Sequence, residues 1–276
     1  MSTARGPTVP SSTRRYGLIM RHFAITVAYD GTPYGGWQIQ QNTVTIQQVL
    51  IDAIEQATGE RVHVQGSGRT DSGVHASGQV AAFTLTNWRA PAIRLVPAIN
   101  RFLPRSIALH DCRETVASFD PIRAAKSKRY RYTLRNARTP DPIQHPFHWW
   151  FPRPLDVDAM KQGGALLLGT HDFSAFETLG SPRKTSVRTV KELSIDTTVY
   201  TEGCDLRIEI EADGFLYNMM RNIVGALCEV GVGRFAPRWI QTVLESKTRN
   251  ACSQTAPPQG LCLIAVRYPE SLFVSN

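Results

Sequence analysis

The sequence has few cysteines and no long apolar run. Its five cysteines are odd in number, widely spaced and form no CxxC pair, which argues against a disulfide framework or a zinc site. This cysteine usage fits a reducing cytosol best, so we expect a cytoplasmic location. No apolar run approaches the roughly 20 residues that a membrane-spanning helix needs, so we expect no membrane partner.

The first 20 residues lack acidic side chains and lack the apolar core of a secretory signal. Their Pro, Ser, Thr and Arg content resembles that of an organellar transit peptide but favours a disordered basic tail over residues 1–21. Met20 directly precedes the first strand-like run. We therefore hypothesise that Met20 is the native start, which the intact mass of the protein from its own host would test.

The glycine-rich stretch at residues 66–80 (GSGRTDSGVHASGQV) lacks the features of the common phosphate-binding loops. No Gly-Lys-Ser/Thr follows it, and Gly66, Gly68 and Gly73 do not fit GxGxxG spacing. Glycine lets a backbone adopt positive φ or approach a ligand closely. A plain hairpin turn is the alternative, although a turn does not need an Arg-Thr-Asp core.

Within this stretch Asp71 has no second carboxylate nearby in the sequence. Its nearest charged neighbour is Arg69, which should favour the ionised carboxylate. A lone ionised aspartate suits a nucleophile or a general base. The alternative is that Asp71 only caps a turn.

The formal net charge is +8, which is common among proteins that bind polyanions. Residues 120–135 (DPIRAAKSKRYRYTLR) hold six Lys or Arg against one Asp, with Tyr130 and Tyr132 between them. Cations suit phosphates and aromatic rings stack on unpaired bases, which points to RNA. A solvated strand face with its tyrosines in the core explains the pattern equally well.

Two further basic features need partners. Arg183, Lys184, Arg188 and Lys191 are expected in a Ser/Pro-rich loop. Arg221 lies inside an otherwise apolar helical pattern, where a charge is costly unless it meets an anion. We expect that anion to be Asp71 or a phosphate.

Hydrophobic periodicity predicts an α+β fold. Alternation indicates strands at 22–29, 62–64, 79–85, 129–134, 206–211 and 262–266. Helical spacing indicates helices at 46–57, 156–168, 215–230 and from Pro237. The first helix has Thr45 as N-cap, Gln48 at the capping-box position and Gly59 as its stop. We predict two similar domains with mostly antiparallel sheets flanked by helices: 22–119, carrying the Asp71 loop, and 120–276, completing the cleft.

Several blocks in order resemble the tRNA pseudouridine synthase A family. They are residues 68–76 (GRTDSGVHA) with 78–80 (GQV), 29–31 (YDG) with 36–38 (GWQ), 128–132 (KRYRY), 215–225 (FLYNMMRNIVG) and 260–261 (GL). The resemblance runs from about Phe23 to Pro269. It implies the pseudouridine synthase fold and an isomerase that converts uridine to pseudouridine at positions 38, 39 and 40 of the tRNA anticodon stem-loop. It also implies a homodimer that uses no cofactor or metal.

The same resemblance assigns roles to residues. Asp71 would be the catalytic aspartate, and Arg69 would displace or hold the flipped nucleotide. Tyr130 would stack near the target base and assist proton transfer, and Arg221 would pair with Asp71. The substrate contacts implied are Arg69, Gln79, Lys128, Arg129, Tyr130 and Leu261. Small departures at Ser67, Ser72 and Gln259 bear on fine specificity.

Three other functions compete with this interpretation. One is a pseudouridine synthase that acts on another RNA position, and a second is an RNA-binding protein without catalysis. The third is a metal-dependent nuclease, which needs a carboxylate cluster where the motif offers only Asp71.

Overall fold

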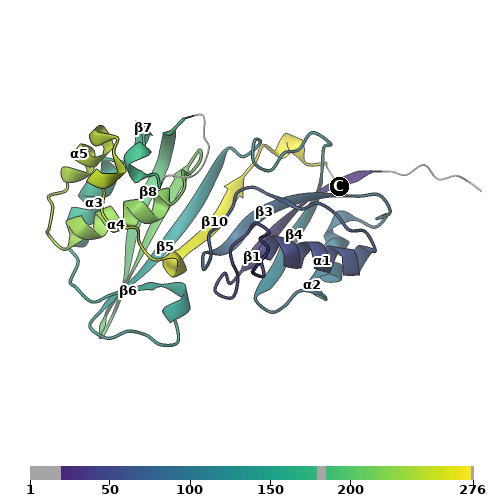
Figure 1. Ribbon diagram of the computed structural model, residues 1–276, viewed down its shortest axis with the longest axis horizontal. Coiled ribbons are helices and arrows are strands. Elements are labelled where there is room, and N and C mark those ends of the chain that lie inside the picture. The colour runs from purple at the N-terminus through teal and green to yellow at the C-terminus, as the bar shows by residue number, and fades with distance from the viewer. Residues whose placement is uncertain (1–19, 179–184, 275–276) are drawn as a thin grey trace, which may run out of the picture.

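A computed structural model describes residues 20–178 and 185–274 of the chain (Figure 1). Residues 1–19 of the predicted tail lie outside the described residues, as do Arg183 and Lys184. Arg21, which the tail prediction included, instead begins the first strand.

The elements follow one another in two groups. The first group comprises β1 (Arg21–Tyr29), α1 (Ile46–Thr58), β2 (Gln65–Gly66), β3 (His75–Leu85), α2 (Leu95–Asn100) and β4 (Ile107–Thr115). The second comprises β5 (Ser127–Ala137), β6 (Trp149–Phe151), α3 (Val157–Ala165), β7 (Gly169–Asp172), β8 (Val187–Tyr200), β9 (Gly203–Ala212), α4 (Met219–Gly231), α5 (Trp239–Ser246) and β10 (Leu261–Arg267). The mixed α+β class predicted from periodicity is confirmed.

The ten strands of the described residues belong to one sheet, with the main order β4-β1-β3-β10-β5-β9-β8-β7. Most neighbours are antiparallel, as predicted; β10 pairs parallel with β3, and β6 with β5. The strands of the two predicted domains are thus joined edge to edge in this one sheet. The physical reason is β10, which returns from the end of the chain to hydrogen-bond between β3 and β5.

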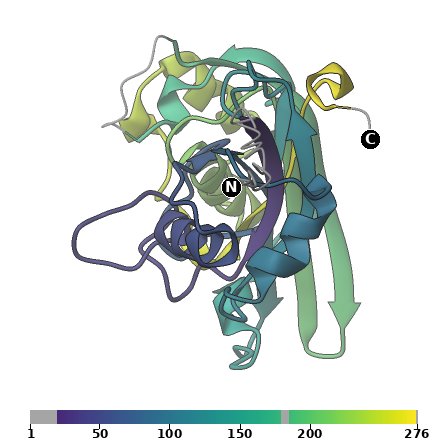
Figure 2. The same ribbon diagram turned by 90° about the vertical axis from the view of Figure 1, so that its right-hand side faces the viewer.

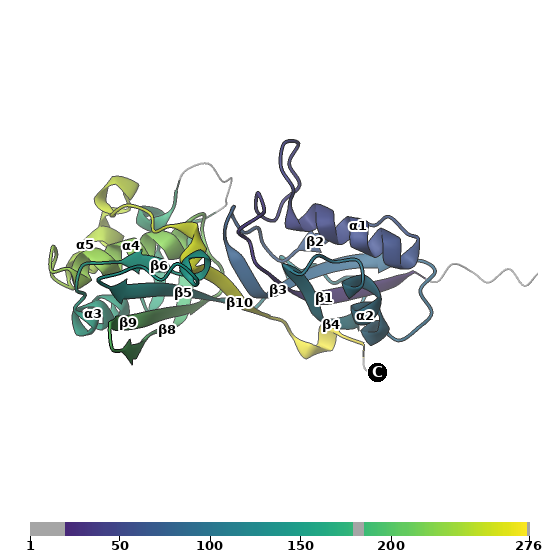
Figure 3. The same ribbon diagram turned by 90° about the horizontal axis from the view of Figure 1, so that it is seen from below.

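Each group nevertheless has its own apolar core. One core gathers residues of β1, α1, β3, α2 and β4, and the other gathers residues of β5, β9, α3, α4 and α5. Strand β10 contributes to both, with Leu263 in the first core and Leu261 in the second. Figure 3 shows α1 on the same side of the sheet as α4 and α5.

Helix α1 forms for the reasons its sequence predicts. Thr45 accepts a hydrogen bond from the Gln48 backbone N–H, and Gly59 ends the helix in the left-handed region at φ 76°. The Gln48 side chain does not complete a capping box, because it donates to Asp52 instead. The segment that leads into α1 extends away from the body of the molecule (Figures 2 and 3).

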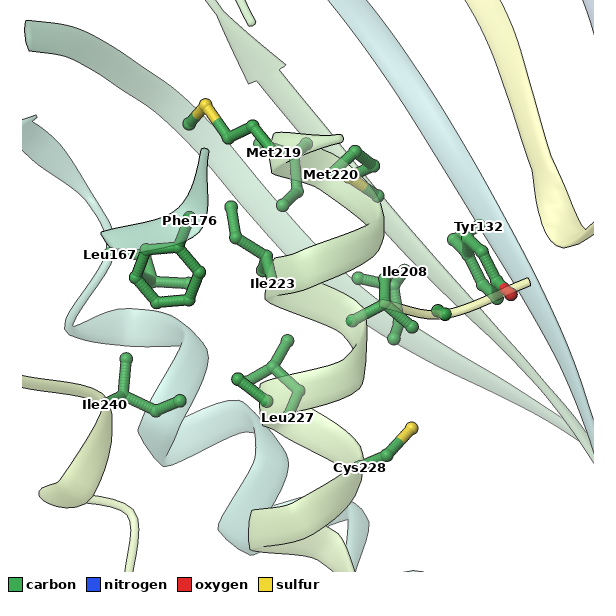
Figure 4. Packing of buried hydrophobic residues seen from close by; sticks show 14 of the residues in the cluster. Tyr132, Leu167, Phe176, Ile208, Met219, Met220, Ile223, Leu227, Cys228 and Ile240 are labelled. Atoms are coloured by element: carbon green, nitrogen blue, oxygen red, sulfur yellow. The ribbon is translucent and has the colours of Figure 1, made fainter. Parts of the chain in front are cut away.

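Helix α4 packs its apolar face into the second core. Ile223 and Leu227 lie among Leu167, Phe176 and Ile240 (Figure 4). The helix begins at Met219 rather than at Phe215, because Asn218 adopts a left-handed backbone at φ 60° that interrupts the helical path. Residues 215 and 216 are therefore irregular, and residues 217 and 218 form a turn before the helix.

Other elements also differ from those predicted from hydrophobic periodicity. Residues 62–64 form no strand, and the pairing begins at Gln65. Arg188 and Lys191 lie on β8 and not in a loop. Strands β4 and β8 were not predicted, because exposed polar residues break their alternation.

Candidate active site

The glycine-rich loop, residues 67–74, connects β2 to β3 at the middle of the sheet, where β3 meets β10. Gln79, fully buried on β3, holds the start of this loop. Its side-chain N–H donates to the Gly68 carbonyl at 2.9 Å, and its carbonyl oxygen accepts from the Ser67 hydroxyl at 2.7 Å. Gln79 was expected to contact substrate, but it supports the loop instead and does not line the cavity beside Asp71.

The segment before α1 clamps the middle of the loop. The backbone N–H of Trp37 donates to the Thr70 carbonyl at 3.0 Å. From β1, the Tyr29 hydroxyl lies 2.8 Å from the Thr70 hydroxyl. Gly36 has φ 94°, and a Cβ there would lie 2.6 Å from the Thr70 oxygen. Only glycine allows this approach, which fixes the backbone next to Asp71.

A cavity of about 710 Å³ opens beside this loop. Its walls come from the loop, from β5 and from residues 215–221. Six of the eight residues implied by the resemblance line it: Arg69, Asp71, Lys128, Tyr130, Arg221 and Leu261. Residues separated by up to 192 positions in the sequence (69 to 261) therefore meet at one place.

Asp71 and Arg221 form an ion pair, with Oδ2 and Nη1 3.5 Å apart. The predicted anion partner for Arg221 is thus confirmed as Asp71. Two more hydrogen bonds orient the guanidinium: Nε donates to the Ala256 carbonyl at 2.7 Å, and Nη1 donates to Asn218 Oδ1 at 3.0 Å. The left-handed turn at Asn218 therefore serves to aim Arg221.

Burial raises the pKa of the Asp71 carboxyl above its ordinary value, while the charge and hydrogen bonding of Arg221 act in the opposite direction. Arg69 was expected to hold Asp71 ionised. Instead the Arg69 side chain is exposed at the cavity. Among the described residues, no hydrogen bond or ion pair joins Arg69 to Asp71. Arg221 takes the role that sequence proximity gave to Arg69.

Tyr130 lines the cavity and packs edge-on against Phe215, with ring centroids 4.8 Å apart. Burial, with a smaller contribution from the negative charge of Asp71, raises the pKa of its phenol. The phenol therefore retains its proton at neutral pH. Lys128, on the same face of β5, donates from Nζ to the Ser67 carbonyl at 2.6 Å and supports the loop.

Arg129 lies outside the cavity. Side chains alternate along a strand, so Arg129 points to the face of β5 opposite Lys128 and Tyr130. It forms ion pairs with Glu192, Glu209 and Glu211, and it does not line the cavity. The structure therefore separates Arg129 from the other residues that were expected to contact substrate.

Tyr132 is a core residue. It is fully buried, and its hydroxyl donates to the Pro257 carbonyl at 2.7 Å. The core position predicted as the alternative therefore holds for Tyr132, whereas Tyr130 lines the cavity.

Sequence reasoning missed two features of the site. Phe215 was assigned to a helix but packs against Tyr130 from the turn before α4. Gly36, which was known only as part of a motif, lies against the glycine-rich loop. Only the tertiary structure reveals either contact, since both join segments far apart in the chain.

The described residues also lack two kinds of feature. They hold no group of three or more His, Cys, Asp or Glu side chains placed to bind a metal ion. Nor do they include a helix long and apolar enough to cross a membrane.

Comparison with known proteins places this site in a family. The tRNA pseudouridine synthase family model matches residues 25–119 and 165–269. The chain is 45% identical over 249 residues to the tRNA pseudouridine synthase A of Thermoanaerobacter sp. (strain X514), covering 90% of this chain and 100% of that protein. It is 43% identical to the protein of that name from Myxococcus xanthus, covering 90% of this chain and 92% of that protein.

The ranges matched by the family model span both groups of elements and include the residues that line the cavity beside Asp71, apart from Ile122, Lys128 and Tyr130. The chain belongs to the tRNA pseudouridine synthase family.

Proposed function

We propose that this protein isomerises uridine to pseudouridine in tRNA, with the Asp71 carboxylate as its catalytic group. The observation that carries the proposal is the Asp71–Arg221 ion pair, which lies in a cavity beside Tyr130. Family membership supports the reaction class, and the ion pair in the cavity supports Asp71 as the group that performs it.

The chemistry is an exchange of bonds within one nucleotide. The bond from C1′ to N1 breaks, the base rotates, and a bond from C1′ to C5 forms. C5 loses its proton and N1 gains one, so the product is an isomer and no other reactant is consumed. An ionised Asp71 can attack C1′ or the base, or abstract a proton from the sugar, and Arg221 favours that ionised form.

The surrounding residues fit the accompanying steps. The target base must leave its stack, which costs a few kcal/mol. Arg69, exposed at the cavity, is placed to hold the displaced nucleotide or its phosphate. Tyr130 lines the cavity as a protonated phenol, so it can stack near the base and deliver or relay a proton.

We also propose uridines 38, 39 and 40 of the anticodon stem-loop as the targets, and a homodimer as the working form. The support is the full-length likeness to proteins named tRNA pseudouridine synthase A. Light scattering of the purified protein with and without tRNA tests the dimer. A monomeric mass under both conditions would contradict it.

The test of function uses an unmodified tRNA transcript with uridines at the three positions. Pseudouridine is mapped by carbodiimide labelling and primer extension, with EDTA present and with Asp71→Asn alongside. We expect stops at those positions for the original chain and none for the variant. Stops at other positions would indicate a different RNA target.

The remaining alternatives give different results in the same assay. A binding-only protein would retain tRNA without producing stops. A metal-dependent nuclease would cleave the transcript, and EDTA would prevent the cleavage.

A further inference from the structure

The segment that leads into α1, together with the first turn of that helix, contains no charged side chain. No Asp, Glu, Lys, Arg or His occurs from Gly31 to Ile51, in a protein with net charge +8 and 20% charged residues. Within it, residues 38–44 form a hairpin that stands away from the rest of the molecule (Figures 2 and 3). We call residues 38–44 the arm.

The base of the arm is rigid. The Gly35 N–H donates to the Val44 carbonyl at 2.9 Å, and the Gln40 side chain donates to the Gly35 carbonyl at 2.8 Å. Gln47, only 3% exposed, accepts from the Ile39 N–H at 3.0 Å. These bonds fix where the arm leaves the body of the protein.

That position is beside the catalytic loop. Gly36 and Trp37, which directly precede the arm, are the residues that contact Thr70 next to Asp71. The arm thus leaves the protein beside the loop that carries Asp71.

The tip of the arm offers amides and no cations. Gln41 and Asn42 are exposed, and their side chains form no hydrogen bond within the described part of the chain. Phosphates are bound mainly by cations, whereas amides both donate to and accept from base edges and ribose hydroxyls. Ile39 and Val44, 43% and 58% exposed, add apolar surface beside these amides.

We propose that the arm binds the minor groove of the RNA helix next to the target uridine, through Gln41 and Asn42. In A-form RNA this groove is wide and shallow and displays 2′-hydroxyls and base edges, while the major groove is too deep and narrow for side chains to read. The inference rests on the proposed function, and it assigns the arm the task of placing the helix so that one uridine reaches Asp71.

Salt dependence distinguishes this contact from a phosphate contact. The Kd for an unmodified tRNA transcript is measured over a series of KCl concentrations for the full chain and for Gln41→Ala/Asn42→Ala. Loss of two hydrogen bonds should weaken binding roughly tenfold at every salt concentration, with an unchanged salt slope. Arg69→Gln should instead flatten the slope by about one phosphate contact.

A second measurement identifies the groove. Transcripts with 2′-deoxyribose in the stem beside the target should bind the original chain more weakly, and should not weaken the double variant further. The matched control, Gln241→Ala/Thr242→Ala, removes an amide and a hydroxyl from exposed positions on α5 and should leave the Kd unchanged. Unchanged melting temperatures confirm that the variants are folded.

A Kd for the double variant within twofold of the original would overturn the proposal. So would a loss that vanishes at high salt, or 2′-deoxy effects that add fully to the double variant. These results differ from a failure of the proposed function, in which the original chain itself would produce no pseudouridine in tRNA.

Discussion

The catalytic role proposed for Asp71 places an ionised carboxylate in an unfavourable environment. Burial makes its ionised form costly, and Arg221 offsets only part of that cost, because the pKa remains above its ordinary value. Burying a carboxylate in this way lowers the stability of the folded protein, as is common at functional sites.

Asp71→Asn should therefore separate activity from stability. The variant keeps the shape of the side chain but removes the charge, so the rate of pseudouridine formation should fall by on the order of 10³-fold or more. Binding to tRNA should stay within a few-fold, and the melting temperature should not fall. Single-turnover assays, filter binding and calorimetry measure the three quantities, and full turnover by the variant would refute the assignment.

The pH profile provides a second test at this scale. The proposed mechanism needs ionised Asp71, so kcat/KM should fall as the pH drops through the raised pKa, above the value near 4 of an ordinary aspartate. Arg221→Gln removes the group that lowers this pKa, so the acidic limb should move to higher pH. Arg131→Gln, which alters the opposite face of β5, is the control and should leave the limb in place.

At the scale of elements, the catalytic loop depends on a neighbouring turn. Gly36→Ala adds a Cβ 2.6 Å from the Thr70 oxygen in a backbone at φ 94°. The loop must shift, so we expect a large loss of kcat together with roughly 1–2 kcal/mol of stability. Gly59→Ala has a similar φ of 76° but open space around it. It should lose stability by a like amount and keep its kcat in steady-state assays.

Two helices show where hydrophobic periodicity predicts an element correctly and where it does not. The helix from Ile46 was predictable because its cap, apolar face and stop are all local. The start of α4 was not, since the left-handed turn at Asn218 is supported by distant partners such as Thr178. Local rules thus located the helix but not the turn that aims Arg221.

At the scale of the whole molecule, β10 joins the two cores. Leu263, 1% exposed, comes from the end of the chain but packs in the core built mainly from residues 23–112. The cavity lies along this junction, and Leu261 of the same strand lines it. Correct docking of β10 is therefore a condition for assembling the site.

Leu263→Ala should destabilise the protein by about 2–5 kcal/mol, because it leaves a void in a packed core. Val199→Ala, at a site 77% exposed, is the matched control and should change stability by less than about 0.5 kcal/mol. Urea unfolding followed by tryptophan fluorescence measures both. Equal midpoints for the two variants would show that β10 does not hold the first core together.

Local sequence patterns were enough to predict the class of the fold, the strands and helices with strong periodicity, and the motif that displays Asp71. They also showed that Arg221 needs an anion, because a charge in an apolar helix must be compensated. The tertiary structure decided which anion that is, that Arg129 faces away from the cavity and Tyr130 into it, and that one sheet unites both cores. These outcomes depend on strand pairing between residues more than a hundred positions apart, such as Leu263 with Tyr130, and no local pattern encodes such pairing.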